Sequence, residues 1–247
     1  MLAYVIDTDL KKFSFSTVLI FSFSLFAQVN LTVPKEILDE METVKVMVTD
    51  SVYYTFRVVR PKMSSGEKDP VVLCLSGGDQ SEAVVNYSYA AWFRSEKFDQ
   101  YWKIMPVSTD GVNFKAIDSS SAAKILNSIL TEFYTLEDDW IALGTSYGGF
   151  AAFRFVAANP KLFTGVITMP GSMSNDIAAD STWNHLKVLL AVGSEDIDPW
   201  KNAADKSVEL LSPHVSVVKK FVIKKAGHVL PIGFKIDPVY HAYFNLY

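Results

Sequence analysis

A pentapeptide at residues 144–148, Gly-Thr-Ser-Tyr-Gly, constrains this chain more than any other segment. It follows the apolar run 140–143 and precedes the apolar segment 149–158, which is expected to be a buried helix. A serine with a glycine two residues away on either side is typical of a sharp turn from a strand into a helix. A side chain at either glycine would collide with the neighbouring strand or helix. The pattern therefore predicts a strained turn that holds the Ser146 hydroxyl clear of a sheet.

Short apolar runs alternate with helical patterns along the rest of the chain. Strands are expected at 43–48, 52–59, 71–75, 102–107, 140–143, 163–169, 188–192 and 215–223, and a helix is expected between 119 and 136. The polar turn between the first two strands is tight, so this pair is expected to be antiparallel. Later strands are apolar throughout and separated by helices, which predicts an α/β fold with a mostly parallel sheet of about eight strands, covered on both faces.

The composition excludes several classes of protein. With 247 residues, 49% of them hydrophobic, the chain can bury a substantial core in one large domain. The net charge is −4 and no long basic run occurs, so nucleic acid is not an expected partner. Cys74 is the one cysteine and lies in an apolar run, where it is expected to be buried; no intramolecular disulfide can form. No Cys/His cluster has zinc-site spacing, so neither a metal nor a cofactor is expected.

Residues 1–27 differ from the rest of the chain. Lys11 and Lys12 precede an uncharged, largely apolar stretch that ends at Ala27 and is too short to span a bilayer comfortably as a helix. A positive flank, an apolar centre and a small final residue predict a secretory signal that is cleaved near Ala27. A buried strand or an uncleaved anchor is the alternative. We therefore expect a secreted or periplasmic protein whose mature chain, 28–247, is a single catalytic domain without stable membrane insertion.

Reactive side chains follow the ends of the predicted strands. The loop after the seventh strand offers Glu195, Asp196 and Asp198, and His228 follows the last strand. In open α/β sheets such groups gather at the carboxyl ends of the strands. A serine hydroxyl becomes a nucleophile when a histidine takes its proton, and a carboxylate must orient that histidine. The sequence therefore predicts a site made of Ser146, His228 and one of the three carboxylates.

Three other histidines compete with His228 for this role. His185 and His214 precede predicted strands, which places them at the wrong end of the sheet, and His241 lies in a predicted terminal helix. His228 is therefore the expected base.

From residue 43 to the end, the chain resembles the serine α/β-hydrolase superfamily. The motif at 144–150 is similar to the turn around the nucleophile in secreted esterases and in prolyl-oligopeptidase-type peptidases, and so is the segment 160–163 before an apolar strand. Members carry serine, acid and histidine in this order along the chain. They place the acid three residues after the glycine that ends a strand and the base in a Gly-His pair near the C-terminus. The resemblance therefore implies a triad of Ser146, Asp196 and His228.

The resemblance also implies an oxyanion hole made of two backbone amides. One is that of Tyr147, after the nucleophile, and the other comes from the loop after the third strand, where Gly78 is the expected donor and Asp79 the alternative. Ser76 in this loop replaces a histidine that many relatives carry. Asp79 would oppose anionic substrates unless its side chain points away into a turn.

The expected function is hydrolysis of a carboxylic ester through an acyl-enzyme on Ser146. The gap between 169 and 188 leaves room for a short helix but no large cap, which favours an open site for soluble esters or for acyl groups displayed on a polymer. Aromatic residues between 87 and 102 are expected to pack in the core rather than to bind a sugar or aryl group. A prolyl-oligopeptidase-like peptidase and a non-catalytic binding protein are the alternatives. The sequence specifies neither the acyl chain and the alcohol nor the oligomeric state.

Overall fold

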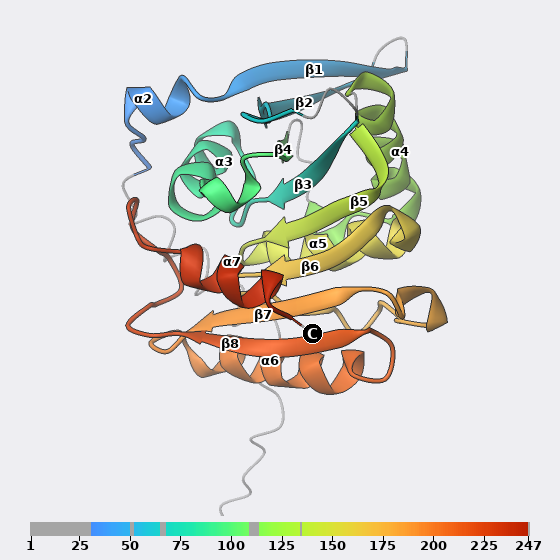
Figure 1. Ribbon diagram of the computed structural model, residues 1–247, viewed down its shortest axis with the longest axis vertical. Coiled ribbons are helices and arrows are strands. Elements are labelled where there is room, and N and C mark those ends of the chain that lie inside the picture. The colour runs from blue at the N-terminus through green and yellow to red at the C-terminus, as the bar shows by residue number, and fades with distance from the viewer. Residues whose placement is uncertain (1–30, 50–51, 65–67, 109–113, 134, 247) are drawn as a thin grey trace, which may run out of the picture. The chain divides into compact units, whose positions relative to one another are not determined.

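Eight strands form one mixed sheet in the computed structural model, which describes residues 31–246 apart from 50–51, 65–67, 109–113 and 134. The strands are β1 (Glu42–Thr49), β2 (Val52–Val59), β3 (Asp69–Leu75), β4 (Trp102–Val107), β5 (Thr135–Gly144), β6 (Phe163–Thr168), β7 (Lys187–Gly193) and β8 (Val217–Ile223). Their order in the sheet is β1-β2-β4-β3-β5-β6-β7-β8 (Figure 1). β2 runs antiparallel to both of its neighbours, β1 and β4. The remaining strands, β3 to β8, are all parallel to one another. The predicted fold class and the antiparallel first pair are confirmed.

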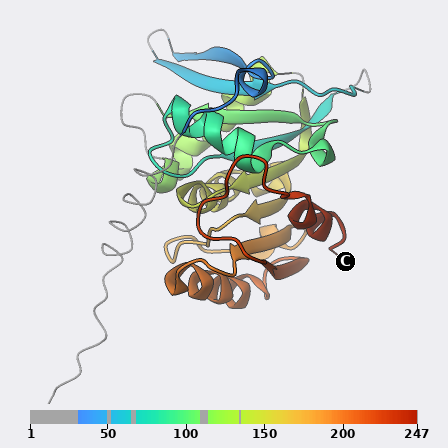
Figure 2. The same cartoon turned by 90° about the vertical axis from the view of Figure 1, so that its left-hand side faces the viewer.

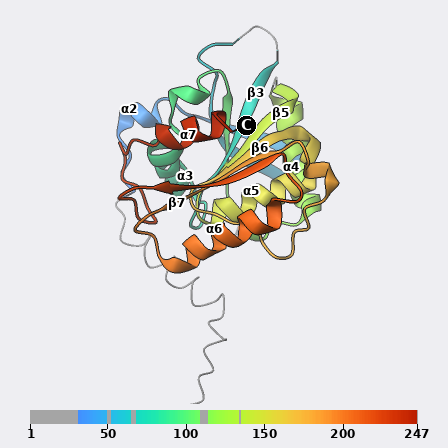
Figure 3. The same cartoon turned by 60° about the horizontal axis from the view of Figure 1, so that its bottom comes forward.

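Helices cover both faces of the sheet. They are α2 (Lys35–Leu38), α3 (Glu82–Ser88), α4 (Ser119–Glu132), α5 (Tyr147–Ala158), α6 (Asp198–Leu211) and α7 (Asp237–Phe244). α3 and α7 lie on one face, and α4, α5 and α6 lie on the other (Figures 1 and 3). Figure 2 looks onto the edge where the parallel strands end, and the red segment that leads from β8 to α7 lies across this edge.

Three predicted boundaries are wrong. The expected helix between 119 and 136 ends at Glu132, β5 begins at Thr135 and not at 140, and β8 begins at Val217 and not at 215. Phe133 continues the apolar spacing of the helix, but its backbone is extended and its ring packs against Phe56 and Trp102. The spacing of apolar residues therefore predicted too long a helix, because a buried aromatic residue in an extended segment can occupy the next apolar position of the pattern. The predicted signal segment, residues 1–27, lies outside the described residues.

The inner strands are buried on both faces, as their uninterrupted apolar sequences predicted. β4 is buried at every position, whereas β8, at the edge of the sheet, is mostly half-exposed. The aromatic residues expected in the core are there: Tyr87, Tyr89, Trp92, Phe93, Tyr101 and Trp102 are all buried. Between β6 and β7 the chain forms only one short helix, Ser181–Trp183, so there is no large cap. None of the described helices is long and apolar enough to cross a membrane.

The start of α5 packs against the backbone of β3 with no space for a side chain. A Cβ added to Gly148 would overlap the Leu75 carbonyl group and lie only 2.6 Å from the Ser76 oxygen. A Cβ added to Gly144 would lie 2.5 Å from the carbonyl carbon of Gly148. Both glycines of the pentapeptide are therefore required sterically, as the sequence predicted.

Replacing Gly148 by alanine should destabilise the fold, because the atoms that an added methyl group meets are backbone atoms that cannot rotate away. Overpacking of this kind costs about 3 kcal/mol or more, which corresponds to a Tm drop of roughly 6–12 °C in a chain of this size. Gly227→Ala is the matched control, since nothing lies within 4 Å of its added Cβ. Thermal unfolding of both variants checks this, and an unchanged Tm for Gly148→Ala would contradict it.

The thiol of Cys74 should not react in the native protein. Cys74 is buried in β3, and burial raises the pKa of its thiol far above the usual value, so the reactive thiolate is not formed at neutral pH. A thiol reagent should label no group in the folded protein at pH 8 and one group per chain after denaturation, since the chain has one cysteine. Rapid labelling of the native protein would show that β3 opens readily.

Candidate active site

Ser146 occupies the sharp turn between β5 and α5. Its φ is +52°, in the left-handed region that a residue with a side chain rarely adopts. Two backbone hydrogen bonds hold the turn: Thr145 N donates to Leu75 O at 3.0 Å, and Ser146 N donates to Pro170 O at 2.6 Å. The two acceptors are carbonyl groups at or just after the carboxyl ends of β3 and β6, the two neighbours of β5 in the sheet. The strained serine turn predicted from the glycine spacing is confirmed.

The three side chains predicted for the site meet at the carboxyl ends of β5, β7 and β8. His228 Nε2 lies 3.0 Å from Ser146 Oγ, and His228 Nδ1 lies 3.2 Å from both carboxylate oxygens of Asp196. Ser146, Asp196 and His228 are only 3%, 4% and 7% exposed. Ile197 N also donates to Asp196 Oδ1, at 2.8 Å. This continuous row of hydrogen bonds can carry a proton from the hydroxyl to the imidazole while the carboxylate holds the ring.

The competing acids and histidines lie elsewhere. Glu195 and Asp198 are exposed, and Asp198 forms an ion pair of 2.9 Å with Lys201. His185 Nε2 lies 3.0 Å from Phe163 O at the first residue of β6, which is the opposite edge of the sheet. His241 lies in α7. His214 lies in the turn between α6 and β8, where its N–H donates to Leu211 O. Among the described residues, the Ser146 hydroxyl has its hydrogen bond to His228 and none to these alternatives.

The loops that carry Asp196 and His228 are joined by their backbones. Glu195 N donates to Ala226 O at 2.9 Å. A Cβ added to Gly193 would lie 2.7 Å from the carbonyl carbon of Ala226, so the two chains approach more closely than side chains would permit. This contact fixes Asp196 and His228 relative to each other. The Tyr87 hydroxyl donates to Leu230 O at 2.9 Å and thus connects the loop of His228 to α3.

Trp200 is a residue of the site that the sequence reasoning missed. Its ring centroid lies 4.9 Å from that of His228, with 38° between the planes. Trp200 also packs in a buried cluster with Tyr147, Phe150 and Val192. A buried indole beside the imidazole excludes water and strengthens the hydrogen bonds of the ring. Its place in the first turn of the helix after the acid loop was the signal that could have revealed it.

The two backbone amides expected to form an oxyanion hole belong to the start of α5 and to the loop after β3. Tyr147 is the first residue of α5, so its N–H has no partner within the helix. Gly78 adopts a φ of +56° in the loop after β3. Asp79 is exposed and its carboxylate accepts from Ser81 N at 2.9 Å, so this side chain closes a turn of its own. This is the alternative from the sequence in which the Asp79 side chain takes part in a turn and does not oppose anionic substrates.

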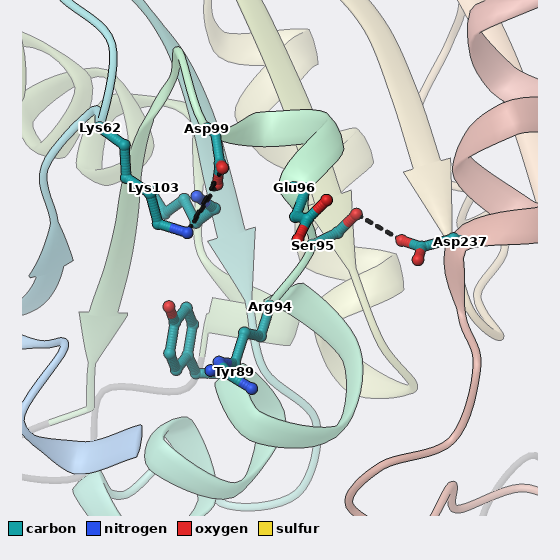
Figure 4. Close-up of a pocket in the computed structure, with 8 residues that line it drawn as sticks. All are labelled: Lys62, Tyr89, Arg94, Ser95, Glu96, Asp99, Lys103 and Asp237. Carbon is teal, nitrogen blue, oxygen red and sulfur yellow. Dashed lines mark hydrogen bonds and ion pairs between the residues drawn. The ribbon is translucent and has the colours of Figure 1, made fainter. Parts of the chain in front are cut away.

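A polar cavity of about 290 Å³ lies away from these residues (Figure 4). It is lined by Lys62, Tyr89, Arg94, Ser95, Glu96, Asp99, Lys103 and Asp237. Lys103 is the second residue of β4 and lies at the edge where the parallel strands begin, opposite Ser146. Burial lowers the pKa of its ammonium group, which donates to Phe98 O at 2.9 Å.

Several of the charged side chains around this cavity form ion pairs. Lys62 pairs with Asp99 at 3.2 Å, and Arg94 forms a bidentate pair with Glu40, which also accepts from the Tyr89 hydroxyl. The cavity is therefore part of a structural ion-pair network. Within the described part of the chain, no group of three or more His, Cys, Asp or Glu side chains is arranged to hold a metal ion.

Comparison with known proteins identifies the fold. No protein-family model and no curated protein matches the chain. Among solved structures, a thermostable esterase aligns with a TM-score of 0.59 and 18% identity over 83% of this chain, which spans 61% of the length of that esterase. A dienelactone hydrolase from Anabaena variabilis aligns with a TM-score of 0.59 and 20% identity, over 83% of this chain and 96% of that one.

A third structure, a fluorophosphonate-binding serine hydrolase of Staphylococcus aureus with bound substrate, aligns with a TM-score of 0.58 and 13% identity, over 83% of this chain and 97% of that one. Sequence identities this low establish the fold and leave the chemistry to the residues of this chain. The strand order, the turn at Ser146 and these alignments agree that the chain has the α/β-hydrolase fold.

Proposed function

We propose that this protein is a serine hydrolase that cleaves carboxylic esters through an acyl-enzyme on Ser146. The observation that carries the proposal is the continuous hydrogen-bonded row from Ser146 Oγ through His228 to Asp196, set at a strained turn. The stability of the fold does not by itself require a serine with a left-handed backbone at the end of this row. It matches the requirement of a hydroxyl nucleophile for an adjacent base and an orienting acid.

In the first half-reaction, Ser146 Oγ attacks the carbonyl carbon of the ester while His228 Nε2 takes its proton. Asp196 accepts a hydrogen bond from Nδ1–H and stabilises the imidazolium that forms. The amides of Tyr147 and Gly78 are proposed to donate to the negative oxygen of the tetrahedral intermediate. The C–O bond to the alcohol then breaks, and His228 gives the proton to the departing alkoxide.

In the second half-reaction, water replaces the alcohol. His228 takes a proton from the water, whose oxygen attacks the acyl carbon, and the bond to Ser146 Oγ breaks as the proton returns to that oxygen. The products are a carboxylic acid, an alcohol and the unchanged enzyme. All groups in this scheme belong to the chain, so each can be tested by substitution.

Two observations favour an ester over an amide as the substrate. Two of the structural neighbours are an esterase and a dienelactone hydrolase. The connection between β6 and β7 carries the short helix Ser181–Trp183 and no large cap, which is compatible with small or polymer-displayed esters. Turnover of a p-nitrophenyl ester, compared with that of a dipeptide anilide, separates this proposal from a peptidase.

Replacing Ser146 by alanine should remove ester turnover by about 10³-fold or more, because triad members act as a unit. A fluorophosphonate probe should label the wild-type protein and leave Ser146→Ala unlabelled. Unfolding midpoints serve as the control for an intact fold. Residual activity of more than a few per cent, or labelling of the variant, would exclude Ser146 as the nucleophile, and an inert wild-type protein would favour a non-catalytic binding role.

Asp196→Asn should lower kcat by about 10³–10⁴-fold, since an amide in this place favours the wrong tautomer of the histidine. Glu195→Gln and Asp198→Asn are matched controls in the same loop that remove a charge from exposed side chains, and their kcat should stay within about twofold. Steady-state kinetics on a short-chain ester measures all three. A larger loss in Asp198→Asn than in Asp196→Asn would reassign the acid.

A further inference from the structure

Gln80 is a buried polar residue at the end of the loop that follows β3. It is 1% exposed and has a φ of +60°, in the left-handed region. Its side-chain amide is used at both ends: Nε2 donates to Ser76 O at 3.1 Å, and Oε1 accepts from Phe114 N at 2.9 Å. Only this orientation of the amide satisfies both partners, since one is a carbonyl and the other an N–H.

The backbone of Gln80 makes two further hydrogen bonds. Its N–H donates to Gly77 O at 3.2 Å, and its carbonyl accepts from Ser108 N at 2.9 Å. Ser108 directly follows β4, and Phe114 begins the short helix η3 (Phe114–Ala116). One residue thus ties the loop after β3 to two points of the chain after β4.

The opposite side of the same loop rests on the serine turn. The start of α5 leaves no room for a side chain at Gly148 against the carbonyl groups of Leu75 and Ser76. The Ser76 carbonyl therefore lies between α5 and the amide of Gln80. The hydroxyl of Ser76 is buried and has no hydrogen-bond partner among the described residues, so it is the carbonyl that anchors this residue.

We propose that Gln80 is a positioning residue for catalysis, which sets the Gly78 amide toward the oxyanion by fixing the Ser76 carbonyl two residues earlier. The inference rests on the proposed function. Donors that are held in place before the reaction stabilise the developing charge without reorganisation, and a displacement of about 1 Å can cost 10²-fold in rate. The backbone of Gln80 is held in the left-handed region, and backbone strain of this kind clusters at functional sites.

Gln80→Met tests this proposal, because methionine has a similar length and removes both side-chain hydrogen bonds. We expect kcat on a short-chain ester to fall about 10- to 100-fold with KM within about twofold. The inhibition constant of a trifluoromethyl ketone, which forms a tetrahedral oxyanion on the serine, should rise by the same factor as kcat/KM falls. Gln100→Met is the matched control at an exposed site before β4, and its kinetics should equal those of the wild type.

Gln80→Glu provides a second readout and decides the matter if Gln80→Met does not fold. A protonated carboxyl group can still donate to the Ser76 carbonyl, whereas the carboxylate repels it. The activity of this variant relative to the wild type should therefore fall as the pH rises. A purely structural role would lower Tm while leaving kcat, the inhibition constant and this activity ratio unchanged, and that result would overturn the proposal.

Failure of this inference is distinguishable from failure of the proposed function. If the wild-type protein turns over the ester and Ser146→Ala does not, the triad is established independently of Gln80. Full kcat and unchanged inhibition in Gln80→Met would then refute the positioning role alone.

Discussion

The rest of the site depends on the contact between two stretches of backbone, the start of α5 and the end of β3. Because nothing larger than hydrogen fits at Gly148, the serine turn rests directly on Leu75 and Ser76. The same contact lies at the start of the loop that carries Gly78. The proposed nucleophile and the start of that loop are therefore placed by main-chain packing, which has fewer degrees of freedom than a contact between side chains. The proposed catalytic geometry follows from this steric limit.

The free-energy cost of burying the Asp196 carboxylate is offset by its hydrogen-bond partners. Asp196 is buried, and its carboxylate is compensated by the imidazole of His228 and by the Ile197 N–H. Trp200 closes one side of the imidazole. At the opposite edge of the sheet, Lys103 is also buried, and its ammonium group donates to the Phe98 carbonyl group. Of these two buried polar sites, only the first combines a hydroxyl, an imidazole and a carboxylate.

The sequence predicted what depends on local pattern and on strand ends. The strands, their burial and the serine turn follow from periodicity and from the two glycines, and Asp196 and His228 follow from their places after β7 and β8. Gln80 and Trp200 were missed because their roles arise from contacts between distant segments. Gln80 bonds to Phe114, 34 positions away, and no periodicity encodes such a pair. The end of α4 was misjudged for the same reason, since Phe133 is held by tertiary packing.

The row of hydrogen bonds at the site joins residues that are far apart in the chain. Ser146 and His228 are separated by 82 positions, and the base loop is tied to Tyr87 across 143 positions. Contacts between such distant residues require the closure of long loops, which costs conformational entropy. A chain in which the segment after β8 has not yet docked lacks the partner of the Ser146 hydroxyl. The proposed site is therefore complete only once the segment that carries His228 lies against the turn at Ser146.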